Sequence, residues 1–141
     1  MRLWRPPLLA AWRGDAAGAA GLAKEMTNSA SDRGEGAALT YADYAQAVLY
    51  NGHGSYRAAA EAAHRASAVD EIVISPWALY ELVEAAARGD QQERARAAAG
   101  QLSQLAAASA SNWARGVAAR SRALVSADAP PKRNTARRSS C

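Results

Sequence analysis

The sequence is poor in the residues that usually build a protein core. It contains no phenylalanine, one cysteine and two methionines, and leucine, isoleucine and valine number 11, 2 and 6 among 141 residues. A lone cysteine (Cys141) excludes an internal disulfide. Alanine, in contrast, accounts for 39 residues. Because alanine is the strongest helix former, this composition predicts helices with a core of small side chains.

The chain also lacks a charge excess over most of its length. Its formal charge is +4, yet residues 1–128 hold 13 basic and 13 acidic side chains, so the excess lies in Lys132, Arg133, Arg137 and Arg138. Disorder by composition requires high net charge as well as few large apolar residues. We therefore expect a folded domain over 1–128, incomplete at both ends, and a basic disordered tail over 129–141.

No long apolar run is present. The longest one near the N-terminus, Leu8 to Trp12, stops after five residues at Arg13. A signal peptide needs an apolar run of roughly 7–15 residues and a membrane span about 20. A cytoplasmic protein that binds no membrane is the expectation.

The clearest structural pattern is a helical hairpin between Leu39 and Ser67. Apolar residues recur at helical spacing in its first half, at Tyr41, Tyr44, Ala45, Val48 and Leu49. Thr40 precedes this run as an expected N-cap, and Asn51 to Gly54 form the expected turn. Ser55 is expected to cap the second helix, whose small face is formed by Ala59, Ala63 and Ala66.

Other helices are predicted before this hairpin and after it. A helix that ends at Gly14 is followed by one that Asp15 caps and that runs to about Ser29, and Asp32 to Gly36 form a loop. After the hairpin, Val69 to Ile74 are interpreted as a packed loop, although Ile72 to Ile74 alone resemble a strand.

Three more helix starts follow from capping signals. Ser75-Pro76 opens a helix that ends at Arg88-Gly89, Asp90 with Glu93 forms a capping box, and Asn112 caps the last helix, Trp113 to Val125. The expected inward faces of these three helices are Leu79, Leu82, Val83, Ala86 and Ala87, then Ala95, Ala98, Leu102, Leu105 and Ala106, then Val117, Ala118, Ser121 and Leu124.

The hairpins recur with a fixed period. The aromatic–alanine pairs Tyr41-Ala42, Trp77-Ala78 and Trp113-Ala114 lie 36 residues apart, each near the start of the first helix of a hairpin. A period of about 30–40 residues with paired helices is typical of tetratricopeptide-like solenoids. The central unit matches part of that pattern at Ala47, Tyr50, Gly54, Tyr56, Ala59 and Ala66. We predict an all-α, tetratricopeptide-like solenoid of about three hairpins.

No catalytic, cofactor or metal constellation is predicted. His53 and His64 have no cysteine nearby and lack HxxxH spacing, so metal binding is disfavoured. Glu81 and Glu84 are one turn apart, but a solvated helix face is favoured over an acid–base pair. Trp77 and Trp113 are interpreted as packing residues, with partner anchors as the weaker alternative.

The basic residues of the C-terminal part suggest nucleic-acid binding as one hypothesis. Arg115, Arg120 and Arg122 precede the basic tail, yet the chain offers neither a recognition helix nor interleaved aromatics. Solvated charge is therefore the favoured interpretation. No GxxxxGK[ST] motif is present to hold a nucleotide phosphate.

Four segments resemble the helical-repeat region of large LuxR-family transcriptional regulators from actinobacteria. They are AAWRGD (10–15), AVLYNG (47–52), WALYELVEAAARGD (77–90) and ARSRALVS (119–126). In such regulators an ATPase domain precedes the repeats and a DNA-binding helix-turn-helix domain follows them. The resemblance ends at Ala127, where a frameshift or truncation would explain the change to Pro130-Pro131 and the basic end.

The resemblance implies a segment that senses a protein partner or small effector along its repeat surface. It implies no ATP hydrolysis and no specific DNA binding by this chain alone. A free-standing adaptor that binds a protein partner is the alternative, and an enzyme is disfavoured. Incomplete, alanine-rich hairpins also predict marginal stability and weak self-association.

Overall fold

A computed structural model describes residues 5–33, 36–68 and 74–127, and within these ranges all regular secondary structure is α-helical. The described helices are α1 (Arg5–Trp12), α2 (Ala16–Arg33), α3 (Gly36–Gly52), α4 (Tyr56–Ser67), α5 (Ile74–Arg88), α6 (Gln92–Ala108) and α7 (Asn112–Ala127). The predicted all-α class is confirmed for this part of the chain. The predicted tail, residues 129–141, lies outside it, as do residues 69–73 of the predicted packed loop.

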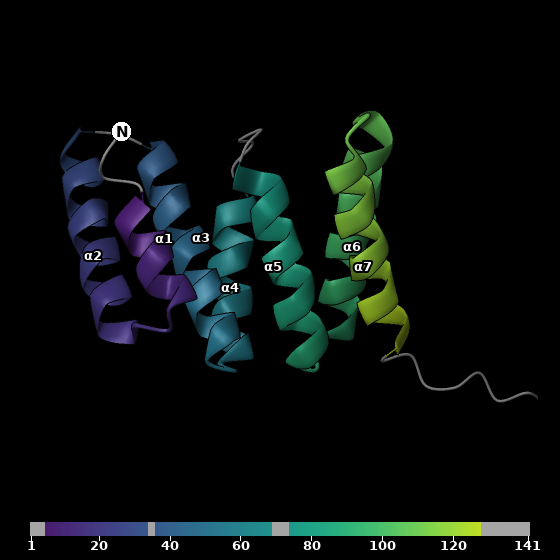
Figure 1. The fold of residues 1–141 in the computed structure, drawn as a ribbon, viewed down its shortest axis with the longest axis horizontal. Coiled ribbons are helices and arrows are strands. Elements are labelled where there is room, and N and C mark those ends of the chain that lie inside the picture. The colour runs from purple at the N-terminus through teal and green to yellow at the C-terminus, as the bar shows by residue number, and fades with distance from the viewer. Residues whose placement is uncertain (1–4, 34–35, 69–73, 128–141) are drawn as a thin grey trace, which may run out of the picture.

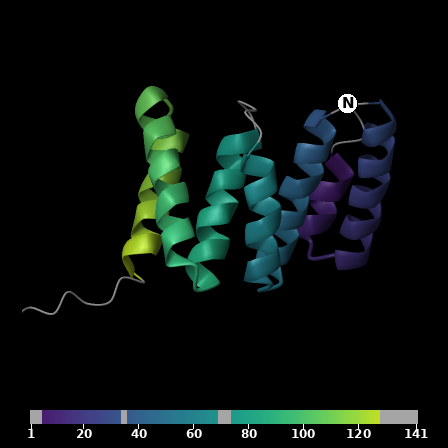
Figure 2. The same cartoon turned by 180° about the vertical axis from the view of Figure 1, so that it is seen from behind.

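Each helix packs against the next one along the sequence. Additional contacts join α1 to α3, α3 to α5 and α5 to α7, whereas the described parts of α2, α4 and α6 do not contact one another. Figures 1 and 2 show the helices side by side in a row, with α2 at one end and α6 and α7 at the other. The odd-numbered helices therefore form a continuous layer.

The core is built mainly from alanine, as the composition predicts. The predicted small face of α4 is completely buried at Ala59, Ala63 and Ala66. The larger buried residues that pack with these alanines come from α3 and α5, and include Tyr44, Val48, Leu49, Leu79, Leu82 and Val83. Because alanine lacks bulk beyond Cβ, α4 can pack closely against both neighbouring helices.

The predicted inward faces agree with the structure in α3 and α5. All ten residues assigned to those two faces are buried. In α6 the prediction fails at Leu105, which is 44% exposed. In α7 only Ala118 and Ser121 of the predicted face are buried, because within the described residues that helix packs against α6 and α5 alone.

The helix α3 begins about one turn earlier than predicted. Thr40 is not an N-cap: α3 begins at Gly36, and the Thr40 hydroxyl donates to the Gly36 carbonyl oxygen at 3.2 Å. Asp32 and Arg33 likewise belong to α2, and Gly36 to α3, so the predicted loop is shorter than expected. Burial explains the longer helix α3, since its first turns include Ala38, which is buried in the core.

The start of α5 is also earlier than predicted. Ile74 is the first residue of this helix and is buried, so it belongs neither to a loop nor to a strand. Ser75 lies inside the helix, and its hydroxyl donates to the Ser67 carbonyl oxygen at 3.2 Å instead of capping. The gain from burying Ile74 outweighs the local capping signal.

The capping predictions for the remaining helices have mixed outcomes. Asp15 is confirmed, because its Oδ1 accepts a hydrogen bond from the Gly18 amide at 2.9 Å. Ser55 occupies the N-cap position of α4 but makes no side-chain capping bond. At the start of α7 the cap is Ser111, whose Oγ accepts from the Ala114 amide at 3.4 Å, and Asn112 is already helical.

The turn between α5 and α6 differs from the predicted capping box. Gln91 is the N-cap residue of α6 and makes no side-chain capping bond. Asp90 adopts a positive φ of 61°, which L-residues other than asparagine and aspartate rarely do. The aspartate therefore serves as a left-handed turn residue after Arg88-Gly89, where the predicted end of α5 is confirmed.

Two glycine turns are close in space although they are 40 residues apart. Gly14 and Gly54 have φ values of 72° and 75°, the left-handed conformation that only glycine adopts without strain. The His53 Nε2 atom lies 3.0 Å from the Gly14 carbonyl oxygen. This contact ties the α1–α2 turn to the α3–α4 turn.

Candidate functional site

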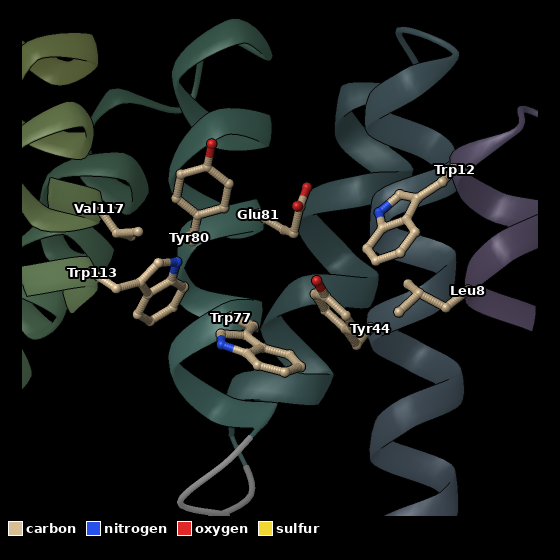
Figure 3. A pocket seen from close by; sticks show the side chains of 8 residues that line it. All are labelled: Leu8, Trp12, Tyr44, Trp77, Tyr80, Glu81, Trp113 and Val117. Carbon is tan, nitrogen blue, oxygen red and sulfur yellow. The ribbon is translucent and has the colours of Figure 1, made fainter. Parts of the chain in front are cut away.

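A pocket lies on the layer of odd-numbered helices. It has a volume of about 410 Å³. The side chains that line it come from α1, α3, α5 and α7, and are Leu8, Trp12, Tyr44, Trp77, Tyr80, Glu81, Trp113 and Val117 (Figure 3). Five of these eight are aromatic, and we call the site the aromatic pocket.

Helical spacing explains how each element contributes to the aromatic pocket. Side chains three or four residues apart lie on one face of a helix. On α5 this relation holds for Trp77, Tyr80 and Glu81, and on α7 for Trp113 and Val117. The neighbouring face of α5 bears the buried residues that hold the helix against the core, so the pocket residues project from a fixed support.

The aromatic rings contact one another in tilted arrangements. The ring centroids of Tyr44 and Trp77 are 6.0 Å apart with an interplanar angle of 45°, and those of Trp77 and Trp113 are 6.4 Å apart at 72°. Such pairs are favourable by roughly 0.5–1.5 kcal/mol beyond their buried area. They link α3, α5 and α7 through side chains alone.

The tryptophans of the aromatic pocket remain open to solvent. Trp12, Trp77 and Trp113 are 63%, 38% and 52% exposed, whereas Tyr44 is only 7% exposed. Large exposed apolar side chains gathered on one face mark interaction sites more often than scattered ones do. The pocket therefore combines a buried tyrosine at its base with accessible indole rings at its edge.

Glu81 is the acidic group of the aromatic pocket and is half-buried. Its Oε2 atom accepts a hydrogen bond from Nδ2 of Asn51 on α3 at 2.8 Å, and the same amide nitrogen lies 3.1 Å from the Glu81 backbone oxygen. Burial raises the pKa of the Glu81 carboxyl above its ordinary value, more than the hydrogen bond from Asn51 lowers it. Within the described residues, no cationic side chain forms an ion pair with Glu81.

The adjacent acidic residue is in a different environment. Glu84 lies 3.3 Å from the Arg88 guanidinium and 3.6 Å from that of Arg120 on α7. The Arg120 guanidinium also lies 5.0 Å from the centroid of the Tyr80 ring. Two arginines thus neutralise Glu84, and Arg120 joins α7 to α5 beside the aromatic pocket.

These observations correct the sequence interpretation of the two glutamates. They were expected on a solvated helix face, but Glu81 is half-buried in the pocket and Glu84 is ion-paired. The sequence spacing could not show this, because the groups that bury Glu81 belong to other helices. Trp77 and Trp113, interpreted from the sequence as packing residues, contact each other, but both are partly exposed and line the pocket.

The other candidate residues are distributed over the surface. His64 is exposed on α4, away from His53, and the described residues contain no group of three or more metal-ligating side chains. Arg115 hydrogen-bonds to Asn112, and Arg122 donates to the Ser103 hydroxyl at 3.3 Å. The three arginines are exposed, as expected, and each also contacts a neighbouring side chain.

Sequence reasoning missed the aromatic pocket as a site. The sequence pattern places Tyr44 and Val117 on inward helix faces and Leu8 and Trp12 in a short apolar run, and it predicts no role for Tyr80. The spacing in the sequence indicates part of the site: Leu8 and Trp12 are four residues apart and share one helix face, as do Trp113 and Val117. What no spacing could reveal is that α1 contributes to the same cavity as α7.

The fold defines an all-helical domain of seven described helices, packed in sequence order. In the described part of the chain, no helix is both long and apolar enough to span a membrane. Comparison with protein-family models, curated proteins and solved structures finds no match to this chain. The resemblance to LuxR-family regulators thus stays a prediction from the sequence segments.

Proposed function

We propose that this chain is the interaction or sensing segment of a LuxR-family transcriptional regulator, and that it holds an effector or partner in the aromatic pocket. The observation that supports this most directly is the composition of the pocket. All four odd-numbered helices contribute side chains to it, and its three tryptophans are accessible. A ligand seated there would contact the whole layer at once.

The proposal includes a tetratricopeptide-like solenoid. Tyr41, Trp77 and Trp113 lie within the first two turns of α3, α5 and α7, the first helices of successive pairs. Contacts between odd-numbered helices, without contacts between the described even-numbered ones, favour a row that curves toward its odd side. Solenoid repeats use such concave surfaces for binding.

The packing suggests how binding would be transmitted. The odd-numbered helices contact their neighbours through small side chains in the core and through aromatic rings at the pocket. A ligand that binds better to one spacing of these helices shifts the population toward that spacing. In a regulator, adjoining domains would respond to that shift.

A free-standing adaptor that binds a protein partner is the second candidate. The exposed tryptophans favour it, because tryptophan is enriched among the residues that dominate binding energy at protein interfaces. Binding, and not catalysis, is common to both candidates. Glu81 accepts a hydrogen bond from Asn51, and Glu84 forms ion pairs with Arg88 and Arg120. These contacts disfavour a role for the two glutamates as an acid–base pair.

Two experiments test the proposal. The DNA on both sides of this reading frame is sequenced: coding segments for an ATPase upstream and a helix-turn-helix downstream support the regulator, and a complete independent operon supports the adaptor. If neither arrangement of neighbouring genes is found and no helix-turn-helix is encoded in any frame, the regulator proposal fails.

The pocket itself is tested with Nile red, a neutral dye whose emission shifts in apolar sites. Titration of the full chain is compared with Trp113→Ser and with Leu105→Ser, which removes a partly exposed apolar side chain outside the pocket. Binding weakened only by Trp113→Ser locates the ligand in the aromatic pocket. Equal binding by all three proteins would reject the pocket as the binding surface.

A further inference from the structure

We propose that the aromatic pocket binds a small organic cation, an ammonium group carrying alkyl substituents, with the Glu81 carboxylate as its counter-ion. The inference rests on the proposed binding function and specifies the chemistry of its ligand. It follows from three features of the pocket: one unpaired carboxylate, several aromatic faces and a limited volume.

The charge balance of the site favours a cation. Arg88 and Arg120 form ion pairs with Glu84, while the one hydrogen bond to the Glu81 carboxylate within the described part of the chain comes from the neutral amide of Asn51. Arg120 acts on Glu81 through its charge and forms no ion pair with it. A half-buried carboxylate without a cationic partner is unfavourable for the folded protein. A bound cation would compensate this charge, whereas a neutral or anionic ligand would bury it further.

The arrangement of the aromatic rings also favours a cationic ligand. The faces of aromatic rings carry negative electrostatic potential, and tryptophan binds cations most strongly. Trp77 is tilted relative to both Tyr44 and Trp113, so the rings present edges and faces in several directions. In the view of Figure 3 the Glu81 carboxylate lies between Tyr80 and Trp12, with Tyr44 and Trp77 below it.

Volume and hydration narrow the ligand to alkylated ammonium compounds. A cavity of about 410 Å³ accommodates a small molecule, since ligand pockets span roughly 300–1,000 Å³. A primary ammonium is strongly hydrated and loses that water reluctantly on an apolar surface. Alkyl groups reduce the hydration and fill the space between the rings.

An extended proline-rich peptide fits the pocket less well, although such peptides also dock on aromatic grooves. Its backbone oxygens are hydrogen-bond acceptors, and Glu81 would present a further acceptor to them. The Arg120 charge does not contradict a cationic ligand, because that guanidinium is occupied by Glu84 and by the Tyr80 ring.

The test compares choline with its neutral carbon isostere, in which a tert-butyl group replaces the trimethylammonium group. Binding to the full chain is followed by calorimetry and by the fluorescence of the pocket tryptophans. Since the two probes have the same shape, the difference in affinity isolates the charge. We expect choline to bind at least about tenfold more tightly than the isostere.

Variants locate the effect. Glu81→Gln keeps the size of the side chain and an oxygen for Asn51, and should reduce the preference for choline to about onefold to threefold. Trp113→Leu should weaken choline binding by about threefold to tenfold. Glu93→Gln, which removes an exposed carboxylate on α6, is the matched control and should leave the affinity unchanged.

The outcomes separate the two proposals. Equal affinity for choline and the isostere, no choline binding, or an unaltered preference in Glu81→Gln would each overturn the cation inference. If Nile red still binds in a Trp113-dependent way in that case, the proposed binding function survives and only the ligand class is wrong. Circular dichroism of each variant shows whether its helices are intact, so that a loss of binding is not a loss of folding.

Discussion

At the scale of single residues, Glu81 is the most informative side chain of this protein. Burial raises the pKa of its carboxyl above the ordinary value. Residues that are unfavourable for the folded state and line a cavity are typical of functional sites. The raised pKa of Glu81 can be measured through the pH dependence of the free energy of unfolding.

We predict that Glu81→Gln stabilises the protein at neutral pH. The folded-state pKa lies above the ordinary value of 4.5, so the folded state binds the proton more tightly than the unfolded state does. The contribution of Glu81 is therefore most favourable below pH 4.5 and is lost as the pH rises through the folded-state pKa. Urea unfolding of both proteins across this range should show the free-energy difference growing with pH.

Several neighbouring groups influence the pKa of Glu81, so the unfolding data must be compared with those of the variant. Asn51 and Tyr44 on α3, Tyr80 and Glu84 on α5, and Arg120 on α7 all interact with it. The Glu61 carboxyl acts in the opposite direction, because the hydrogen bond from Arg94 lowers its pKa. Only the difference between the variant and the native protein isolates Glu81, and a difference independent of pH would contradict its raised pKa.

At the scale of elements, helix α4 shows how alanine organises the packing. It lies between α3 and α5, contacts both, and buries Ala59, Ala60, Ala62, Ala63 and Ala66 completely. Leucine in these positions would add more apolar area per residue, but it would hold the helices further apart. The small face of α4 thus sets the distance to α3 and α5 as well as forming part of the core.

We predict that Ala63→Leu destabilises the protein by about 1–3 kcal/mol, because the added carbons force well-packed helices apart. Ala58→Leu, on the exposed face of the same helix, should change the stability by less than about 0.5 kcal/mol. Chemical denaturation monitored by circular dichroism measures both. Equal effects of the two substitutions would show that α4 is not closely packed.

At the scale of the whole molecule, α7 is the last of the described helices, and within the described residues it contacts only α5 and α6. Only Ala118 and Ser121 of the described α7 residues are buried. The Leu105 side chain on the neighbouring helix α6 is exposed. A helix in such a row buries apolar surface only where it meets a neighbouring helix, so the described end of the row exposes apolar surface. Alanine-rich interfaces also release less free energy than leucine-rich ones, at about 25 cal/mol per Å².

We predict marginal stability and weak self-association as consequences. The midpoint of thermal unfolding should rise with protein concentration, because association stabilises the folded form by mass action. Circular dichroism melts at two concentrations tenfold apart, together with sedimentation equilibrium, measure both quantities. A sharp transition that is independent of concentration, in a strict monomer, would contradict this prediction.

The sequence by itself determined which segments are helical and which sides of α3, α4 and α5 face inward. These features depend on local propensity and on the helical period, and both can be counted along the chain. The left-handed turn at Gly54 and the cap at Asp15 are equally local. Thr40 and Ser75 were misread as caps because burial of preceding residues extended both helices.

Only the tertiary structure decided where the aromatic pocket lies and what surrounds Glu81. Trp12 and Trp113 are about a hundred residues apart in the sequence and line one cavity because α1, α3, α5 and α7 form one layer. The raised pKa of Glu81 likewise arises from burial among neighbouring helices. Desolvation depends on every atom that excludes water from a group, and those atoms are brought together only by the packing of distant segments.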